Sequence, residues 1–320
     1  MIKVVTTGGA GFIGSNLAEE LTKKGYKVII IDDLSTGKVE NLKGLKGNAD
    51  FIQDSITNLP LLLKLFQGVK YVFHQAARAR VPRSIEDPLT TNEVNITGTL
   101  NVLLAARENG VKKVIYASSS SIYGGTPTLP QSENMPPNPL SPYALTKLAG
   151  EYYCNIFRQL YKLPTVCLRY FNVYGPRQDA QSQYATAIPA FIGRVSQNLP
   201  PVIFGDGEQS RDFTFIEDVV RANILAAESK AEGVYNIGSG QNMTINQLAD
   251  TILKLMQKNL RPIYKEPRPG DPRHTLADIS KAGSFGYKSE WTLDKGLAKT
   301  ITYFSAPQRV GKASAGNQLR

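Results

Sequence analysis

The sequence contains few of the residues that build disulfide frameworks and metal sites. Its 320 residues include only two cysteines, Cys154 and Cys167, and two histidines, His74 and His274. The cysteines fall in a predicted helix and a predicted strand, so we expect free, buried thiols in a reducing cytoplasm. The histidines are far apart in the sequence, and neither has neighbours at metal-ligand spacing. We therefore predict no metal site.

Long apolar runs are absent as well. No segment approaches the ~18 consecutive apolar residues that a membrane-spanning helix requires. The first residues, MIKVVTTGGAGF, lack the charged, apolar and small-residue regions of a secretory signal. A composition of 42% hydrophobic and 20% charged residues is that of a globular protein. These features predict a cytoplasmic protein with no membrane partner.

Acidic residues are fewer than basic ones, with 27 Asp and Glu against 37 Lys and Arg and a net charge of +10. Such a charge suits a nucleic-acid partner, but the basic residues are scattered and form no nucleic-acid-binding motif. A basic surface also suits an anionic small molecule, and we expect no nucleic-acid partner. The final residues, 305–320, show no apolar period and are predicted to form a disordered tail.

Short apolar runs alternate with segments of helical period through the first 170 residues. Helices are predicted at 14–25 and 97–110 among others, and strands at 3–7, 27–32, 49–54, 71–77, 112–120 and 165–172. This alternation is typical of an α/β fold with a doubly wound parallel sheet of Rossmann type. Ligands of such sheets bind at the carboxyl ends of the strands.

The pattern changes after Gly175, where prolines and the glycine-rich segment FGDGEQSRDF appear. The later segments FIEDVVRANILAAE and GVYNIGSG are predicted to return to the first sheet. We therefore predict a Rossmann-type domain from residues 1–175 and about 212–238. A smaller, discontinuous α/β domain is predicted from residues 176–211 and 239–304.

A glycine-rich turn, GGAGFIG at residues 8–14, joins the first predicted strand to a helix. Glycines there let backbone N–H groups approach a pyrophosphate at the positive end of the helix. Asp32 ends the second predicted strand, where a carboxylate accepts hydrogen bonds from the adenosine ribose. The next residue is Asp33 rather than a basic side chain that would suit a 2′-phosphate, so NAD is predicted over NADP.

A tyrosine and a lysine lie one turn apart in the segment LSPYALTKLAGEYY. Ser141 and Pro142 predict the start of a helix, with Tyr143 and Lys147 on the same face. The two could be an ordinary surface pair, or Lys147 could lower the pKa of the Tyr143 phenol for acid–base catalysis. Tyr123 is the weaker acid–base candidate, because no lysine lies four residues after it.

These motifs together resemble the extended short-chain dehydrogenase/reductase family. They comprise the glycine-rich turn, a serine at the end of the fifth predicted strand, and Tyr-x-x-x-Lys 24 residues after Ser119. Within the family, the sequence is most similar to the NAD-dependent nucleotide-sugar 4-epimerases of the UDP-glucose/UDP-N-acetylglucosamine type. Segments that carry the likeness are HQAARARVPRSIEDP, LRYFNVYGPRQ, FGDGEQSRDFTFIEDVV, YNIGSG and RPGDPRHTLADISKA. The resemblance covers about residues 1–304.

The resemblance implies a reaction and three catalytic residues. Ser119 matches the catalytic serine, Tyr143 the acid–base, and Lys147 its partner, which would lower the pKa of Tyr143 toward neutrality. Tyr143 would remove the proton of the sugar 4-hydroxyl while tightly bound NAD oxidises carbon 4. The 4-keto sugar would then rotate and be reduced on its opposite face. A homodimer formed through the helices after Gly98 and Pro142 is also implied.

The resemblance further implies that the first domain binds NAD and the second binds the nucleotide-sugar. Implied cofactor-binding residues are Gly8, Gly11, Phe12, Ile13, Gly14, Asp32, Asp33, Ser35, Thr36, Gly37, Asp54, Ser55, Gln75, Ala76, Ala77, Asn95, Tyr143, Lys147 and Tyr170. Implied substrate-binding residues are Arg80, Arg83, Ser119, Ser120, Ser121, Tyr143, Asn172, Arg211, Arg268, Asp271 and Thr275. Arginine suits a diphosphate because its guanidinium makes bidentate, charge-assisted hydrogen bonds, although each arginine could also be a surface ion pair.

At two positions the sequence departs from the pattern of galactose-type epimerases, and both positions bear on the choice of substrate. Ala79 stands where those enzymes usually have lysine, and Thr275 stands where they have a bulky tyrosine. The smaller side chain leaves room for a 2-N-acetyl group and favours UDP-N-acetylglucosamine, alone or alongside UDP-glucose. Arg78, Arg80 and Arg83 leave UDP-glucuronate open, because they could pair with a sugar carboxylate or equally be solvent-facing loop residues.

Three other functions are disfavoured. A sugar-nucleotide 4,6-dehydratase has Thr-Asp-Glu where this sequence has consecutive serines, so elimination of water lacks an acid and a base. A UDP-glucuronate decarboxylase has an acidic residue near the serine that is absent here. A non-catalytic NAD- or nucleic-acid-binding protein is the alternative from a different class, but binding alone needs no acid–base tyrosine.

Overall fold

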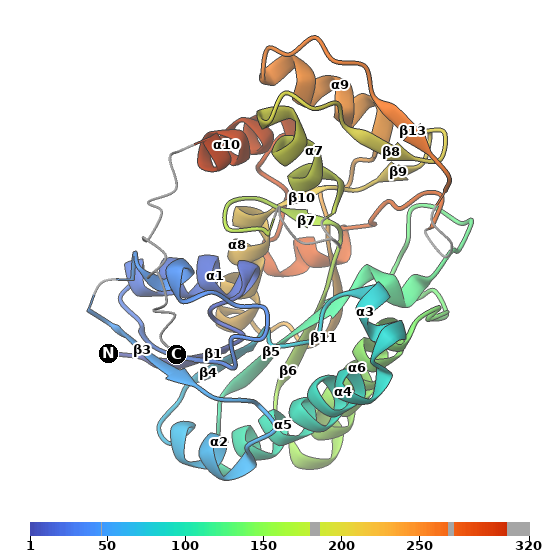
Figure 1. The fold of residues 1–320 in the computed structure, drawn as a ribbon. Coiled ribbons are helices and arrows are strands. Elements are labelled where there is room, and N and C mark those ends of the chain that lie inside the picture. Colours follow the sequence, from blue (N-terminus) through green and yellow to red (C-terminus); the bar gives the residue numbers. More distant parts are fainter. Residues whose placement is uncertain (46, 180–185, 268–271, 306–320) are drawn as a thin grey trace, which may run out of the picture.

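Seven parallel strands form the central sheet, in the order β11-β6-β5-β4-β1-β2-β3. The structure, a computed structural model, describes residues 1–45, 47–179, 186–267 and 272–305 (Figure 1). The strands of the sheet are β1 (Lys3–Thr7), β2 (Lys27–Asp32), β3 (Ala49–Gln53), β4 (Tyr71–His74), β5 (Lys113–Ser119), β6 (Thr165–Tyr170) and β11 (Gly233–Ile237). All neighbouring pairs are parallel, so the predicted Rossmann-type sheet is confirmed. The predicted return of the chain to this sheet is also confirmed, because β11 pairs with β6.

Helices cover both faces of the sheet. Figure 1 shows α1 and α8 on one face and α2, α4, α5 and α6 on the other. The helices are α1 (Phe12–Lys23), α2 (Leu59–Leu65), α3 (Val81–Glu86), α4 (Pro88–Asn92), α5 (Gly98–Glu108), α6 (Pro142–Tyr161) and α8 (Ile216–Glu228), with a π-helical turn, η2 (Glu93–Thr97), before α5. Adjacent residues of β1 show the two layers: Val4 packs with Leu17 of α1, whereas Val5 packs with Leu103 of α5. Such apolar burial on both faces is what a parallel sheet between helical layers requires.

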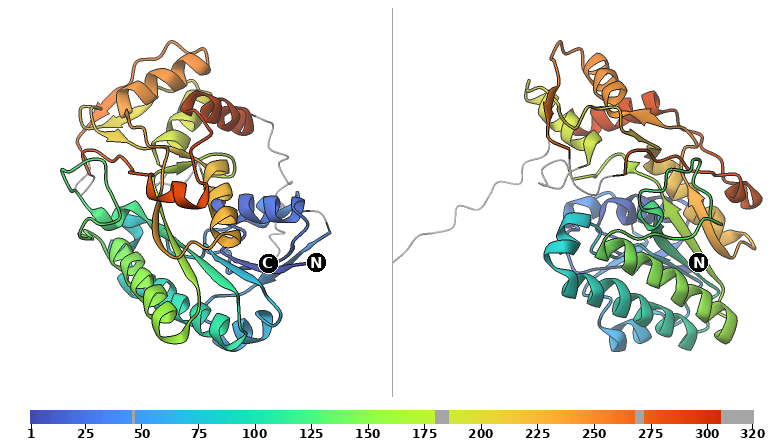
Figure 2. Two further views of the ribbon diagram at one scale, coloured as in Figure 1. Left: turned by 180° about the vertical axis from the view of Figure 1, so that it is seen from behind. Right: turned by 90° about the vertical axis from the view of Figure 1, so that its right-hand side faces the viewer.

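The remaining elements gather at one end of the molecule, as both Figure 1 and Figure 2 show. They are α7 (Ala187–Ser196), α9 (Ile245–Leu255), α10 (Leu293–Ser305), β7 (Val173–Tyr174), β8 (Val202–Phe204), β9 (Ser210–Arg211), β10 (Thr214–Phe215), β12 (Met243–Thr244) and β13 (Ile263–Lys265). Three small two-stranded sheets join β10 to β7, β12 to β9 and β13 to β8. Short 3-10 turns complete the chain: η1 (Val39–Leu42), η3 (Ser120–Tyr123) and η4 (Lys281–Phe285). The predicted division into two domains stays a prediction, and the predicted disordered tail lies almost wholly beyond the described residues.

Helix α6 begins where the sequence predicts. The Ser141 hydroxyl accepts a hydrogen bond from the Ala144 N–H at 3.1 Å, and Pro142 occupies the first helical position. Both features are typical of helix N-termini. This start places Tyr143 and Lys147 in the first turns of α6.

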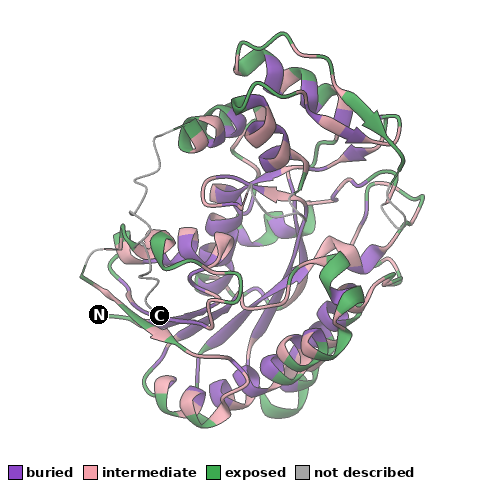
Figure 3. Cartoon of the chain, in the orientation of Figure 1, coloured by how far each residue is buried: buried purple, intermediate pink, exposed green. Residues whose placement is uncertain are grey.

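Burial follows the layered plan, with the strands of the central sheet largely covered (Figure 3). Cys154 and Cys167 are free and buried, as predicted. Within the described ranges, no helix has the length and apolar character needed to cross a bilayer. The same ranges contain no group of three or more His, Cys, Asp or Glu side chains that could hold a metal ion.

Candidate active site

The carboxyl ends of the parallel strands bring the predicted site residues to one edge of the sheet. Thr7, at the end of β1, is paired with His74 of β4. Ser119, at the end of β5, is paired with Tyr170 of β6. Because the ligands of doubly wound sheets bind at this edge, the loops that follow these strands form the candidate site.

Glycines are required in the turn between β1 and α1. Gly8 has a φ of +66°, and a Cβ on Gly14 would lie 2.1 Å from the Gly8 carbonyl oxygen. Gly11 caps α1 with no side-chain hydrogen bond from the described residues, and the first turn of α1 holds no acidic residue. Phe12 and Ile13 follow as the first residues of the helix. The free N–H groups of this terminus therefore suit an anion such as a dinucleotide pyrophosphate.

Asp32, at the end of β2, is hydrogen-bonded to this turn. Its Oδ2 accepts a hydrogen bond from the Ala10 N–H at 2.9 Å, and its Oδ1 accepts one from the Leu34 N–H at 2.8 Å. Burial raises the pKa of this carboxyl group. Gly37 packs directly against it, because a Cβ there would lie 2.7 Å from Oδ1. A carboxylate has about four acceptor positions, so Asp32 keeps the capacity to bind ribose hydroxyls.

The loops after β2 and β3 lie at the same edge. The Ser35 N–H donates to Asp33 Oδ1 at 2.9 Å, and Ser35 and Thr36 are exposed. The Asp54 N–H donates to the Asp32 carbonyl at 3.2 Å, and Asp54 Oδ1 accepts from the Ser55 N–H at 2.6 Å. These predicted cofactor-binding residues are thus neighbours of Asp32 in space.

The loop after β4 packs on the glycine-rich turn. His74 Nδ1 lies 2.8 Å from Thr7 Oγ1, and its Nε2 lies 2.9 Å from Thr99 Oγ1. Burial, together with the charge of Lys147, lowers the pKa of His74 to about 3, so the ring is neutral. The Ala76 N–H donates to Thr7 Oγ1 at 3.3 Å. Ala77 follows in the same loop and is partly exposed.

Gln75 and Tyr170 fix this loop to α8. The Tyr170 hydroxyl donates to Gln75 Oε1 at 3.1 Å, and Gln75 Nε2 donates to Asn223 Oδ1 at 3.0 Å. Burial raises the pKa of the Tyr170 phenol. The polar groups of both residues are therefore engaged with protein partners, and these bonds hold the loop in place.

Asn95 links the cofactor loop to α6. Its Oδ1 accepts from the Arg78 N–H at 2.7 Å, and its Nδ2 donates to the Arg78 carbonyl at 3.2 Å and to Thr146 Oγ1 at 3.0 Å. Asn95 is buried. Asn95, a predicted cofactor-binding residue, thus holds the backbone of the loop after β4 against α6, next to Lys147.

Ser119 and Tyr143 form the reacting end of the site. The Ser119 hydroxyl lies close enough to the Tyr143 phenol to lower its pKa, and the Tyr143 N–H donates to Ser84 Oγ at 3.1 Å. Ser119 Oγ also accepts from the Ser121 hydroxyl at 2.9 Å, which places the adjoining Ser120 and Ser121 at the same strand end. A hydroxyl–phenol pair of this kind can hold a substrate hydroxyl and exchange a proton with it.

In this structure, Lys147 is not among the groups that act on the pKa of Tyr143. Burial raises the pKa of Tyr143, and the opposing contributions come from the Ser119 hydrogen bond and the charge of Arg80, not from Lys147. Lys147 Nζ donates to the Ala117 carbonyl at 2.6 Å and lies 6.0 Å from the centre of the Tyr143 ring. Burial lowers the pKa of Lys147 itself to about 8. The ammonium is directed at a backbone carbonyl in this structure, and the effect of Lys147 on the phenol pKa when NAD is bound stays a prediction.

The two predicted arginines of α3 and its N-terminus are in different settings. The charge of Arg80 acts on Tyr143 and on Asp179, and burial lowers the pKa of its guanidinium. Arg83 is exposed on α3, where its charge acts on Asp87. Only Arg80 therefore lies at the reacting end of the site.

Residues predicted to bind the nucleotide-sugar meet beyond the end of β6. Asn172 Nδ2 donates to the Asp212 carbonyl at 3.0 Å and to Thr275 Oγ1 at 3.2 Å. Arg211 Nη1 donates to the carbonyls of Ser210 at 2.9 Å and Arg273 at 3.3 Å. Three segments far apart in the sequence are thereby brought together. Arg268 and Asp271, also predicted here, lie outside the described residues.

Sequence reasoning missed Asp212, which is fully buried beneath this region. Its Oδ1 accepts from the Ser239 N–H and hydroxyl, each at 2.7 Å, and its Oδ2 accepts from the N–H groups of Gly240 at 3.0 Å and Ala277 at 3.1 Å. One carboxylate thus ties together the segments that carry Arg211 and Thr275. In the sequence, the one feature that connects Asp212 with the site is that it directly follows Arg211, a predicted substrate-binding residue.

A buried ion pair behind the reacting end was also missed. Glu151 Oε2 lies 2.7 Å from Arg169 Nη2, and both side chains are 5% exposed. Glu151 Oε1 accepts from Arg169 Nε at 2.8 Å and from the Ser118 hydroxyl at 2.6 Å. These bonds tie α6, β6 and the end of β5 together, next to Ser119. Glu151 follows Lys147 by four residues, which places it on the same side of α6.

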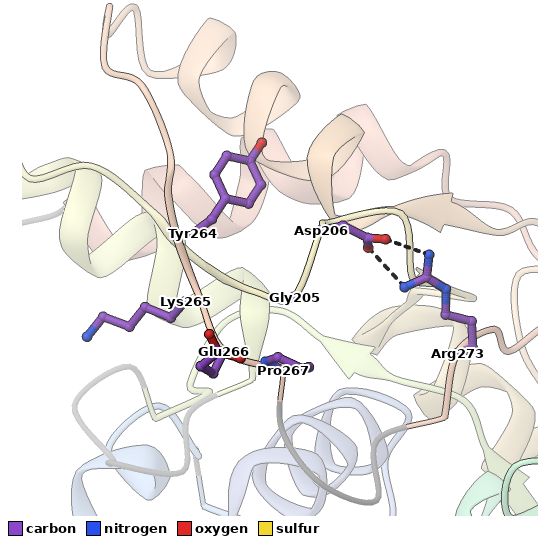
Figure 4. A pocket seen from close by; sticks show the side chains of 7 residues that line it. All are labelled: Gly205, Asp206, Tyr264, Lys265, Glu266, Pro267 and Arg273. Atoms are coloured by element: carbon purple, nitrogen blue, oxygen red, sulfur yellow. Dashed lines mark hydrogen bonds and ion pairs between the residues drawn. The ribbon is translucent and has the colours of Figure 1, made fainter.

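A cavity of about 470 Å³ lies away from the reacting end (Figure 4). Its lining residues are Gly205, Asp206, Tyr264, Lys265, Glu266, Pro267 and Arg273. A two-fold hydrogen-bonded ion pair joins Arg273 to Asp206, at 2.8 and 2.9 Å, across one side of it. The cavity contains none of Ser119, Tyr143 and Lys147, and it adjoins the Arg211 region through the Arg273 carbonyl.

Comparison with known proteins agrees with this geometry. Residues 4–238 match the model of the NAD dependent epimerase/dehydratase family. The chain is 43% identical to a UDP-N-acetylglucosamine 4-epimerase from Methanobrevibacter ruminantium M1, solved with UDP-N-acetylmuramic acid, with a TM-score of 0.92 over 95% of this chain and 98% of that one. It is 40% identical to a UDP-glucose 4-epimerase from Thermotoga maritima with UDP-glucose, with a TM-score of 0.91 and the same coverage.

A third solved structure contains both substrate and cofactor. It is a UDP-glucuronic acid 4-epimerase from Bacillus cereus with UDP-glucuronic acid and NAD, 36% identical, with a TM-score of 0.88 over 94% of this chain and 98% of that one. The glycine-rich turn, the Ser119–Tyr143 pair and the buried Lys147 lie at the carboxyl edge of the sheet, where doubly wound folds bind their ligands. By sequence, fold and site, the chain belongs to the NAD-dependent epimerase/dehydratase family.

Proposed function

We propose that this NAD-dependent UDP-sugar 4-epimerase acts on UDP-N-acetylglucosamine, UDP-glucose or both, with Ser119, Tyr143 and Lys147 as its catalytic residues. The observation that carries the proposal is the placement of Ser119 beside Tyr143 at the sheet edge, with Lys147 one turn along α6. The same proposal assigns the cofactor and substrate contacts to the residues named above. It also assigns the nucleotide-sugar to the predicted second domain.

The residues of the site have separate tasks in the proposed reaction. Ser119 orients the sugar 4-hydroxyl, and Tyr143 takes its proton and later returns one. The charge of Arg80 stabilises the phenolate, because it already opposes the effect of burial on the pKa of Tyr143. When bound, NAD supplies the hydride acceptor and donor for carbon 4 of the sugar. Lys147, buried beside Tyr143, supplies a positive charge at neutral pH.

The residues present fit an NAD molecule. The first turn of α1 offers N–H groups without a side-chain cap from the described residues, and Asp32 retains acceptor capacity at the adjoining strand end. Arg78 adds two buried guanidinium nitrogens without a hydrogen-bond partner in the described chain. Asp33 beside Asp32 disfavours a 2′-phosphate.

The size of two side chains supports N-acetylated substrates. Thr275 is small, 6% exposed, and held against Asn172, so it leaves volume where a bulky side chain would stand. Ala79 likewise offers no long side chain. UDP-glucuronate is the second candidate, and the observation that favours it is the placement of Arg80 beside Tyr143, where a guanidinium could pair with a sugar carboxylate.

A homodimer formed through α6 is also part of the proposal. Leu145, Tyr152, Ile156 and Leu160 of α6 are between 42% and 69% exposed. Their spacing places them along the outer side of the helix. An exposed apolar strip of this kind suits a second copy of the chain, with α5 packed beside α6. The free thiols Cys154 and Cys167 support the proposed cytoplasmic location.

An NMR assay tests the proposed substrates. Purified protein is incubated separately with UDP-N-acetylglucosamine, UDP-glucose and UDP-glucuronate, without added NAD. We expect the galacto-epimer of the first, the second or both to accumulate. Tyr143→Phe should abolish conversion, whereas Tyr152→Phe, on the exposed side of the same helix, should not. No conversion of any of the three, even with added NAD, would overturn the substrate assignment.

A further inference from the structure

Arg78 connects two loops across the glycine-rich turn. Its Nη2 lies 3.3 Å from Asp33 Oδ2. Arg78 follows β4 and Asp33 follows β2, and these strands pair with β1 on its two sides. The ion pair therefore spans the carboxyl end of β1, where the turn of residues 8–14 and the N-terminus of α1 begin.

The guanidinium of Arg78 has donors that the protein does not use. The side chain is 16% exposed, yet Nε and Nη1 are buried without a hydrogen-bond partner in the described chain. An arginine carries five N–H donors, and buried donors without acceptors are destabilising. Neither nitrogen is open to solvent in this structure, but 16% of the side chain is, so a small shift of the guanidinium on binding would bring these donors to an anion at this edge.

Both ends of the bridge are held in place. Asn95 clamps the Arg78 backbone on its N–H and carbonyl sides, at 2.7 and 3.2 Å. Asp33 Oδ1 accepts from the Ser35 N–H at 2.9 Å, which leaves Oδ2 for the guanidinium. Asn95 also bonds to Thr146, next to Lys147. The guanidinium is therefore pre-organised, and its anchor is continuous with the catalytic helix.

We propose that Arg78 binds the diphosphate of NAD, with Asp33 aiming its guanidinium across the glycine-rich turn. This inference rests on the proposed cofactor site. The diphosphate carries two negative charges, and the N-terminus of α1 alone offers only a partial positive charge. Arg78 adds a full charge and a forked donor set that matches phosphate oxygens. With NAD bound, this contact would slow release of the cofactor, and the guanidinium would then not be available to a sugar carboxylate.

Binding measurements on the cofactor-free protein test this role. We expect Arg78→Met to weaken binding of both NAD and ADP by about 10- to 100-fold, the range for a charge-assisted hydrogen bond, and to leave adenosine binding unchanged. Arg78→Lys should retain part of the affinity, with a steeper dependence on salt. Thermal unfolding without ligand reports whether each variant is folded.

Arg158→Met is the matched control. Arg158 also has one ion pair, with Glu232 at 3.5 Å, and a buried Nε without a partner in the described chain, but it lies near the opposite end of α6 from Tyr143. The affinity of the Arg158→Met variant for NAD should lie within about twofold of the wild-type affinity. Equal NAD affinity in the Arg78 and Arg158 variants would overturn the proposal, as would an equal loss of adenosine binding in Arg78→Met. Failure of the wild type to bind NAD would instead refute the cofactor site itself.

Discussion

Lys147 is buried and Tyr143 is partly buried, and desolvation acts on the two groups in opposite directions. It raises the pKa of the Tyr143 phenol and lowers the pKa of the Lys147 ammonium to about 8. In each case desolvation disfavours the charged form. At neutral pH the site therefore holds a neutral phenol beside a lysine that titrates only slightly above neutrality.

The ionisation of Lys147 predicts an alkaline limit to activity. Its pKa of about 8 lies below the ordinary value of 10.5, so the ammonium is lost as the pH rises through about 8. If its charge supports the phenolate, kcat/KM should fall above that pH. The profile is measured from pH 6 to 10. The guanidinium of a Lys147→Arg variant stays charged over this range, so its residual kcat/KM should not fall above about pH 8. A fall of the same kind in this variant would assign the ionisation to another group.

The volume at Thr275 predicts substrate choice. Thr275→Tyr should lower kcat/KM for UDP-N-acetylglucosamine by at least about tenfold relative to UDP-glucose, because added bulk excludes the N-acetyl group. Competition of the two substrates in one reaction measures the ratio. Thr275→Val keeps the size and removes the hydroxyl that bonds to Asn172. An equal change in the valine variant would show that the hydrogen bonds, rather than the volume, set the preference.

At the scale of elements, an ion pair joins α6, which carries Tyr143 and Lys147, to β6, and a hydrogen bond joins the same pair to the end of β5, which carries Ser119. Glu151 belongs to α6, Arg169 to β6, and Ser118 to the end of β5. The Arg169 guanidinium also lies 4.8 Å from the centre of the Tyr123 ring. Because Ser118 precedes Ser119, this network fixes the strand end against the helix that carries Tyr143. It is thus a structural support of the site rather than a part of its chemistry.

Breaking the pair should strongly destabilise the fold. Arg169→Met leaves the Glu151 carboxylate buried without its partner and should lower the free energy of unfolding by about 3–5 kcal/mol. Adding Glu151→Leu should recover much of that loss, because no charge is then left buried. Urea unfolding measures both. Lys27→Met, which breaks the exposed pair with Asp50, should cost less than about 1 kcal/mol.

The outer side of α6 predicts the oligomeric state. Leu160 is 69% exposed on the helix side opposite the sheet, so Leu160→Glu should convert a dimer into a monomer. Light scattering after size exclusion measures the mass. Lys254→Glu, on the exposed side of α9, is the control and should remain dimeric. A monomeric wild type at micromolar concentration would contradict the proposed interface.

At the scale of the whole molecule, long-range contacts assemble the region proposed to bind the nucleotide-sugar. Asn172 and Thr275 are 103 residues apart, and their bond closes over the Asp212 backbone. Asp212 in turn binds the segments around Ser239 and Ala277. The placement of one face of the site thus depends on the packing of segments from β6 to the 275–277 region.

The sequence by itself determined the parallel sheet, the glycine-rich turn and the start of α6. Each depends on a local pattern: apolar runs that alternate with helical periods, a turn that only glycine fits, and Ser141-Pro142 at a helix start. The Tyr143–Lys147 spacing is likewise fixed by helix geometry. The resemblance to nucleotide-sugar epimerases rested on these same short motifs and was confirmed.

Only the tertiary structure decided how these residues act on one another. The raised pKa of Tyr143, the placement of Arg80 but not Arg83 at the reacting end, and the Arg78–Asp33 bridge follow from burial and from contacts between separate loops. The same holds for the missed carboxylates Glu151 and Asp212. The reason is physical: a proton affinity depends on how far a group is removed from water and on which charges surround it, and neither is set by local sequence.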